Sequence, residues 1–526
     1  MLGSASMRSP SKWLRTTDNV SCKPWRHSSS RPRLIGPRDA RRLDVIELCR
    51  RQLSFGDGLI AEEVGDLWED WMRNVDSVLE DALLLDMAYA ALASRWTHSR
   101  TRGRKGTPVD VVIRLLILKH IRNWSYAVLE REVRSNLVYR QFTRVGAAKV
   151  PDAKTLGKLG IAMGPGIIEQ IHQRVVAIAQ EHGVISGRKM RVDTTVVEAN
   201  IHYPTDASLL GDGVRVLTRA MKRIAERTIL SGATFRDRTR STRRCLIQIG
   251  RASRSRGDQG RQRMFQCYRR LTAIAQRVVG QASRFVRELV DGIKRCKRRH
   301  HHKAVERQRK YLESMVPRVQ QVIRQTRERI DEGNTHAPGK IVSLFEPQTE
   351  VIRKGKAGKP TEFGKMIKLQ EAERQVVTHY EVYDKRPSDS ELLIPSLEVH
   401  EQQFGHVPRL VTADAGFFSA RNEVSAYARG VKRVAIPNLA TKSAERKVLQ
   451  KKPWFRTAMK WRTGCEGRIS LLKRRHGLNR CRYKGTAGMR RWVGLGVIAD
   501  NLINIANAMP IPTQGRQTLA DFCAGK

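Results

Sequence analysis

Three acidic residues stand out because of where they occur in a strongly basic chain. Asp193 lies inside a run of Val and Thr residues, where an unpaired charge would be costly to bury. Asp414 directly follows the strand-like run Leu410–Ala413, and two small residues come next. Glu466 is one of two acids in segment 432–491, which holds 19 Lys and Arg residues. Each of these carboxylates therefore requires an explanation.

Together, three carboxylates can carry out chemistry on phosphate esters. They can hold two Mg²⁺ ions about 3.5–4 Å apart, and Mn²⁺ is the expected substitute. Such ions activate an attacking oxygen and stabilise the leaving oxygen during in-line displacement at phosphorus. We therefore interpret Asp193, Asp414 and Glu466 as candidate catalytic residues and candidate metal ligands.

Glu466 also has two cations at helical spacing. Arg462, Glu466 and Lys473 stand at positions i, i+4 and i+11, which fall near one face of a helix. Cations on that face would hold the phosphates of a substrate. The alternative is that Glu466 only pairs with Arg462 on a surface helix, which is worth about 0.3–0.5 kcal/mol. Asp193 and Asp414, on separate predicted strands, favour the metal site.

Other acids compete for these roles. Asp389 and Glu423 have the surroundings of ordinary turn or exposed acids. Asp500 lies in the apolar run Val497–Ile505, which predicts a helix packed on the core. The remaining competitors are Glu198 and Asp206.

The overall charge limits the class of partner. The chain has 99 Lys and Arg against 51 Asp and Glu, a formal net charge of +48 and a pI of about 10.9. This charge is too large for a protein that handles neutral metabolites, and it predicts a polyanionic partner, with nucleic acid first. No apolar run reaches the roughly 18 residues that a membrane span needs. Eight scattered cysteines without zinc spacing indicate reduced thiols and a cytoplasmic location.

The first part of the chain is predicted to be helical after a disordered start. Segment 1–44 is rich in Arg, Ser and Pro, which predicts a disordered basic segment. Apolar residues repeat at spacings of three and four in segment 45–160, which predicts an all-α domain. Part of that domain alternates aromatic residues with arginines, which fits either a charged exterior or a DNA-binding module. The candidate DNA contacts are Arg131, Arg134 and Arg140.

The rest of the chain predicts an α/β domain interrupted by a basic helical insertion. Segment 161–204 is expected to form a linking helix and the first strand, which carries Asp193. Segment 205–338 returns to helical periodicity, and residues 211–340 contain 34 Lys and Arg against 11 acids. Segment 339–508 completes the α/β domain and 509–526 forms a tail. Within 339–508 the predicted strands are Ile341–Phe345, Met366–Leu369, Val376–Tyr383, Arg409–Ala413 and Val431–Ile436.

The residues around the three acids resemble those of the DDE-type transposases of bacterial insertion sequences, and of an unclassified group among them. Asp193–Asn200 followed by Tyr203–Asp206 is similar to the first acidic block of that family, and Thr412–Phe417 to its second. Arg462-x3-Glu466-x6-Lys473 matches most of the family pattern Y-x2-R-x3-E-x6-K, with Met459 at the tyrosine position and Trp461 nearby. The resemblance extends over roughly residues 50–508.

The resemblance implies an α/β RNase H-like catalytic core, with Asp193 on its first strand, Asp414 on its fourth and Glu466 on a late helix. If all the predicted strands form, Asp414 follows the fifth instead. The resemblance also implies Mg²⁺-dependent hydrolysis at the ends of the element and attack by the freed 3′ hydroxyls on target DNA. Double-stranded DNA, a homodimer or higher oligomer on that DNA, and a location at the bacterial nucleoid are implied with it. Arg462, Lys473 and Trp461 would contact the DNA.

Two alternatives stay open at this point. A two-metal nuclease could cut DNA with the same three carboxylates and not join it. A non-catalytic DNA-binding regulator derived from a transposase would keep the basic surface alone. Cleavage that depends on Mg²⁺ separates the regulator from the two enzymes, and a strand-transfer assay separates the enzymes from each other.

Overall fold

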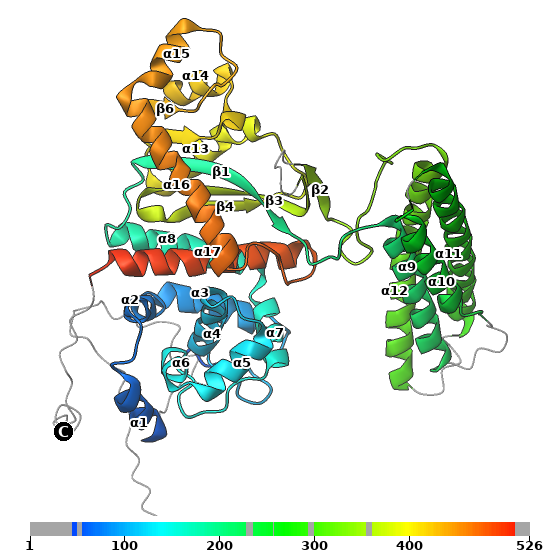
Figure 1. Cartoon of the computed structure of the whole chain (residues 1–526). Helices are drawn as coiled ribbons and strands as arrows, with labels where there is room; N and C mark the ends of the chain where they lie inside the picture. Colours follow the sequence, from blue (N-terminus) through cyan, green and yellow to red (C-terminus); the bar gives the residue numbers. More distant parts are fainter. Residues whose placement is uncertain are drawn as a thin grey trace, which may run out of the picture. The chain divides into compact units, whose positions relative to one another are not determined.

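The computed structural model of the chain describes residues 45–49, 55–227, 235–255, 257–292, 299–353 and 360–510. These residues divide into two compact units, the first from 45–119 with 124–163 and the second from 120–123 with 164–510 (Figure 1). The predicted segment 1–44 lies outside the described residues, as does the predicted tail from residue 511 onward. Within the described residues, no helix is long and apolar enough to cross a membrane.

The first unit is built of helices, as the apolar periodicity predicts. Side chains that accept hydrogen bonds from the first turn begin several of them, including Asp81, Ser125 and Asp152. Arg114 is fully buried and forms an ion pair with Asp76 at 2.7 Å. The helices are α1 (Phe55–Val64), α2 (Asp70–Val78), α3 (Ala82–Ala93), α4 (Val109–Ile121), α5 (Tyr126–Ser135), α6 (Leu137–Phe142) and α7 (Ala153–Ala162).

The second unit contains a mixed sheet of six strands. Their order is β2-β3-β1-β5-β6, and β4 pairs with β3. The pairs of β1 with β3, β2 with β3 and β3 with β4 are antiparallel, whereas β1, β5 and β6 run parallel. The strands are β1 (Lys189–Glu198), β2 (Glu350–Arg353), β3 (Thr361–Glu371), β4 (Val377–Val382), β5 (Leu410–Ala413) and β6 (Arg433–Ala435).

One predicted strand is wrong and one strand was missed. Residues 341–345 form no strand, because Leu344 is buried in the core of the helical insertion and its neighbour Ile341 packs against that core. The short strand β2 follows instead, with only Ile352 of its residues buried. Asp414 therefore follows the fifth strand of the described chain and not the fourth.

Helices cover both faces of the sheet. One apolar core joins β1 and β5 to α13 (Leu393–Phe404) and α14 (Ala420–Ala428), through side chains such as Val192 and Leu397. A second core joins β1, β3 and β4 to α16 (Pro453–Arg475) and α17 (Gly485–Ala508), through Val197 and Trp492 among others. Figure 1 shows α16 crossing the sheet. The helices α8 (Gly164–Glu181) and α15 (Ala444–Lys451) also belong to this unit.

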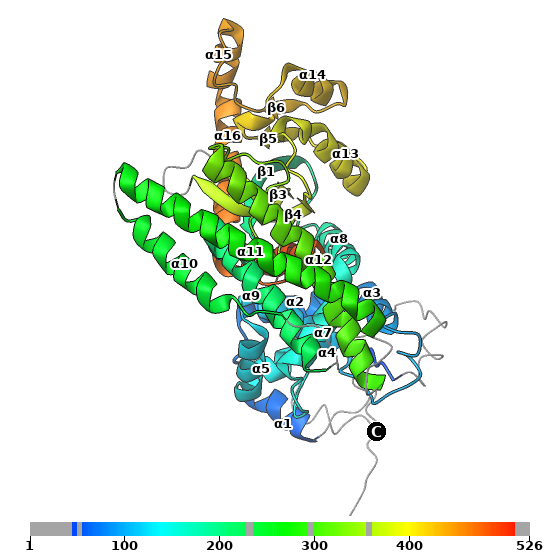
Figure 2. The ribbon, with the colours of Figure 1, turned by 90° about the vertical axis from the view of Figure 1, so that its right-hand side faces the viewer.

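The insertion between β1 and β2 is a bundle of long helices (Figure 2). Small residues allow close packing, since a Cβ atom on Gly213 would lie 2.9 Å from the Val319 side chain. Asp206, in the first turn of the bundle, pairs at 2.7 Å with Arg329, near its end. The helices are α9 (Asp206–Ala225), α10 (Thr239–Ala252), α11 (Asp258–Gly292) and α12 (Arg299–Asp331).

Candidate active site

Asp193 lies in the middle of β1, on the face of the sheet that α16 covers. Side chains alternate along a strand, and Val192 packs into the core on the α13 side. The next side chain, Asp193, therefore faces α16, where its Oδ2 lies 3.8 Å from Arg462 Nη1. The carboxylate is only 14% exposed.

Asp414 is brought beside Asp193 by the register of the parallel strands. Val192 on β1 lies opposite Ala413 on β5, so the residue that follows each is an acid at the same level of the sheet. Asp414 caps a short 3-10 helix by accepting a hydrogen bond of 2.7 Å from the Ala415 amide. Its Oδ1 lies 3.9 Å from Arg462 Nη1, and its side chain is 58% exposed.

Glu466 approaches the same place from helix α16. Arg462, one turn earlier, donates a hydrogen bond of 2.5 Å from Nη2 to Glu466 Oε1. The Glu466 side chain is 59% exposed, whereas that of Arg462 is 11% exposed. Three carboxylates from β1, the end of β5 and α16 thus lie within 4 Å of one guanidinium.

The donor set of this cluster suits a hard divalent cation. Carboxylate oxygens are the ligands that Mg²⁺ and Mn²⁺ prefer, and two of the three side chains are accessible from solvent. Among the residues that the structure describes, no group of three His, Cys, Asp or Glu side chains is arranged to hold a metal ion. The positive charge at the centre of this acidic cluster is Arg462.

A buried ion pair beside the acidic cluster fixes α16 to the sheet. Arg191 on β1 and Glu371 on β3 pair at 2.5 Å, and neither side chain is more than 3% exposed. Arg191 also donates a hydrogen bond of 2.6 Å to the Trp461 carbonyl, and its guanidinium lies 5.0 Å from the centre of the Trp461 ring. A Cβ atom on Gly464 would lie 2.5 Å from Arg191 Nη1, so any larger residue at this helix position would displace the Arg191 guanidinium.

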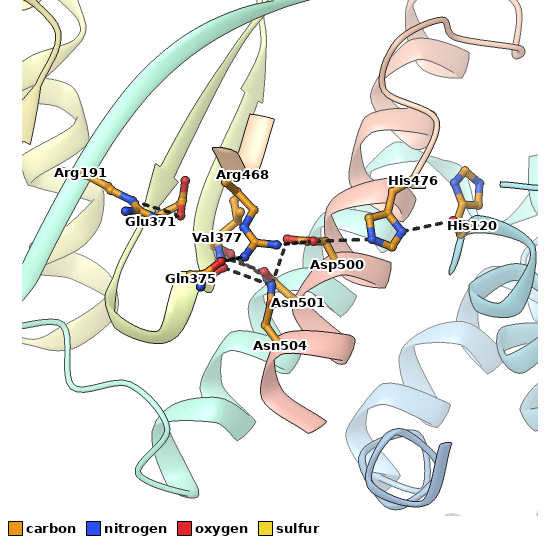
Figure 3. A network of polar contacts seen from close by, with 10 residues as sticks. All are labelled: His120, Arg191, Glu371, Gln375, Val377, Arg468, His476, Asp500, Asn501 and Asn504. Carbon is orange, nitrogen blue, oxygen red and sulfur yellow. Dashed lines mark hydrogen bonds and ion pairs between the residues drawn. The ribbon is translucent and has the colours of Figure 1, made fainter. Parts of the chain in front are cut away.

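A second buried pair joins α16 to α17 (Figure 3). Arg468 pairs with Asp500 at 2.7 Å, and each side chain is 2% exposed. Arg468 also donates to the Gln375 side chain in the turn between β3 and β4, and His476 lies 3.5 Å from Asp500. Burial raises the pKa of Asp500 to about 7 despite Arg468, and burial lowers the pKa of His476 to about 4.

The turn between β3 and β4 is held by α17 as well. Asn501 accepts a 2.8 Å hydrogen bond from the Val377 amide and donates 2.7 Å to the Val377 carbonyl. Asn504 donates to the Gln375 carbonyl at 3.2 Å and to Asp500 Oδ2 at 3.1 Å. Figure 3 shows these side chains gathered around Arg468. The buried groups thus fix the position of α16 from two directions.

The candidate DNA contacts have different surroundings. Arg131 and Arg134 extend from α5 with highly exposed side chains, each paired with a neighbouring glutamate. Arg140 instead donates hydrogen bonds of 2.7 and 2.8 Å to the carbonyls of Gly146 and Ala148. On α16, Trp461 packs under Arg191 and Lys473 is half-buried near the end of the helix. Contact with DNA stays a prediction for these five residues, as it does for Arg462.

Asp389 lies closer to the cluster than its sequence suggests. The Thr194 hydroxyl donates a hydrogen bond of 3.0 Å to Asp389 Oδ1, and Thr194 directly follows Asp193. A Cβ atom on Gly416, two residues after Asp414, would lie 3.2 Å from Asp389 Oδ2. Asp389 thus contacts Thr194 and lies close to Gly416, and these residues are near Asp193 and Asp414 in the sequence. The sequence offers one weak signal, the two acids and two serines of 388–391 before the apolar start of α13.

Comparison with known protein families gives two matches. Residues 68–159, in the helical first unit, match a family described as a transposase domain. Residues 425–506 match a family described as a transposase DDE domain, and this region contains Arg462, Glu466 and Lys473. Comparisons with curated proteins and with solved structures give no match.

The two matches lie at different places in the chain, the transposase domain before the transposase DDE domain. Transposases act on DNA, which agrees with the net charge of +48. The resemblance drawn from the sequence is confirmed by these matches. The two family matches support an insertion-sequence transposase of the DDE type.

Proposed function

We propose that this transposase cuts DNA at the ends of its element in a Mg²⁺-dependent reaction and joins the freed 3′ hydroxyls to target DNA. The observation that carries the proposal is the convergence of Asp193, Asp414 and Glu466 within 4 Å of Arg462. The strand order supports an RNase H-like core, because antiparallel β4, β3 and β1 are followed by parallel β5 and β6. The edge strand β2 would be an addition to that core.

In this proposal the three carboxylates hold the divalent cations. Once bound, these ions supply activation of the attacking oxygen and stabilisation of the leaving oxygen at phosphorus. Asp193 is fixed on a buried strand and is the rigid ligand, whereas Asp414 and Glu466 are more exposed and reach the substrate side. The positions of all three depend on the contact of α16 with β1 and β5.

Cations of the same helix would orient the DNA. Arg462 is within reach of the carboxylates, and its planar guanidinium can bind two oxygens of one phosphate. Lys473 follows on α16 and would contact the backbone further along. The exposed Arg131 and Arg134 and the basic bundle would supply non-specific phosphate contacts, and a dimer or higher oligomer would bring two element ends together.

The test uses the full chain and labelled duplexes that carry the element ends. Wild type should nick the ends and produce joined products with Mg²⁺ or Mn²⁺, and neither with EDTA. Asp193→Asn and Asp414→Asn should lose both products while they keep their affinity for DNA. The control is Asp384→Asn, an exposed acid that pairs with Arg490. Nicking without joining would favour the nuclease, and binding without nicking would favour the regulator.

A further inference from the structure

Arg462 is the positive charge that the three carboxylates face in the structure. Its Nη1 lies 3.8 Å from Asp193 and 3.9 Å from Asp414, and its Nη2 lies 2.5 Å from Glu466. Three carboxylates this close would repel one another, and one guanidinium offsets part of that repulsion. We propose that Arg462 is the resident counter-ion of the metal-free site, and that a divalent cation must displace it to bind. This inference rests on the proposed function.

The contacts of Arg462 are those of a group that can be released. Its hydrogen bond to Glu466 is its one short contact with the three acids. The distances to Asp193 and Asp414 exceed hydrogen-bond length, so those attractions are electrostatic. The Arg462 Nε atom is buried and has no hydrogen-bond partner within the described residues. Compared with Arg468, whose guanidinium bonds to Asp500 and Gln375 on two sides, Arg462 loses few hydrogen bonds on leaving.

The geometry makes the guanidinium and a metal ion competitors. A Mg²⁺ ion requires its oxygen ligands at 2.0–2.1 Å. An ion at that distance from Asp193 and Asp414 would approach a guanidinium that lies within 4 Å of the same oxygens. Two like charges so close, in a partly desolvated site, repel each other strongly. Arg462 must therefore move when the ion binds, and a long side chain held by one short hydrogen bond to these acids can do so.

The displaced guanidinium would then be available to a phosphate of DNA. Metal loading would release Arg462 from the carboxylates, and a phosphate that captured Arg462 would in turn make the carboxylates more available to metal. Such coupling is reciprocal by thermodynamic necessity. The metal-free protein would keep its acids partly neutralised and its arginine withdrawn from DNA.

The test measures Mn²⁺ binding by electron paramagnetic resonance on the full chain, without DNA and without any activity readout. Arg462→Gln and Arg462→Ala should bind Mn²⁺ on the order of tenfold more tightly than wild type, because a repelling charge within 4 Å is removed. The control is Arg474→Ala, which removes an exposed arginine from the same helix and should change the affinity less than about twofold. Asp193→Asn should weaken binding and so assign it to this site. Circular dichroism melting of each variant checks that it is folded.

A second arm tests the coupling. A short duplex of arbitrary sequence, lacking the element ends, should increase the Mn²⁺ affinity of wild type several-fold and leave that of Arg462→Gln unchanged. Equal or weaker Mn²⁺ binding by both Arg462 variants, with Asp193→Asn still impaired, would overturn the counter-ion role alone. Absence of Mn²⁺ binding that depends on Asp193, in every variant, would instead contradict the proposed function.

Discussion

The two sides of helix α16 carry arginine–carboxylate pairs in opposite environments. On the buried side, Arg468 has its own acid, Asp500, and both side chains are almost inaccessible. On the open side, Arg462 faces three acids at once, and two of these are more than half exposed. The buried charges are matched one to one, whereas the open charges are not.

This difference distinguishes charged residues that stabilise the fold from charged residues that are available to bind other ions. A matched buried pair is stable only while both partners are present, and it fixes the position of the helix. An acidic excess around one cation leaves carboxylate oxygens available to other cations. The buried pairs would thus hold the helix so that the open side presents Glu466 toward Asp193. Four predictions test this difference.

The largest effect is expected on the open side, in activity alone. Glu466→Gln should lower end cleavage on the order of 10³-fold, because the proposed metal ligand, worth several kcal/mol, is lost. The free energy of unfolding should change by less than about 0.5 kcal/mol, since the side chain is exposed. Urea denaturation and a cleavage assay on the same preparation measure both. The matched control is Glu445→Gln, an exposed acid on α15, which should leave cleavage intact.

The buried side should respond in the opposite way. Asp500→Asn should lower the free energy of unfolding by about 3–5 kcal/mol, because it leaves a buried guanidinium without its counter-ion. Arg468→Met should cost less, because the raised pKa of Asp500 lets the remaining carboxyl take up a proton. Urea denaturation gives both values. If neither variant lost more than about 1 kcal/mol, the pair would not be what fixes the helix.

His476 gives the buried side a dependence on pH. Burial lowers its pKa to about 4 from the usual 6.5, so the folded protein binds fewer protons than the unfolded chain between these values. Its contribution to stability is complete above pH 6.5 and is lost as the pH falls toward 4. His476→Gln should flatten this part of the profile by up to about 1.4 kcal/mol per pH unit. Denaturation at several pH values measures the slope of the free energy of unfolding against pH, with the exposed His182→Gln as control. Equal slopes for wild type and His476→Gln would show that His476 is not the source of this pH dependence.

The smallest effect is expected at Asp389, which lies beside the open cluster. Asp389→Ala removes the acceptor for the Thr194 hydroxyl and should lower the cleavage rate by up to about tenfold, with little change in DNA affinity. Asp389→Asn keeps an acceptor oxygen and should recover most of the rate. Single-turnover cleavage compares the two variants. An Asn variant as slow as the Ala variant would show that the negative charge matters, and not the hydrogen bond.

Local patterns in the sequence predicted much of this arrangement. The Val and Thr run around Asp193 and the short apolar run before Asp414 both form strands, and the basic segment around Glu466 forms a helix. The role of the three acids stays a prediction, although β1, β5 and α16 bring them together.

Contacts between distant segments could not be predicted in the same way. Arg191 and Glu371 are 180 positions apart, and nothing near either residue indicates its partner. The proximity of Asp389 to Thr194 depends on how the 389–391 turn packs on the sheet. Leu344 belongs to an apolar run typical of a strand, but its side chain packs in the core of the helical bundle.

The ion pair between Asp206 and Arg329 has a consequence for how the chain folds. Strand β1 ends at Glu198 and its partner β3 begins only at Thr361, so their pairing would close a very long loop. The bundle in between is made of local helical contacts, which form fast. Once Asp206 joins Arg329, the two ends of the bundle meet, and the effective loop between β1 and β3 becomes short. The insertion thus lowers the entropic barrier to building the sheet, and we expect it to fold before the catalytic domain around it.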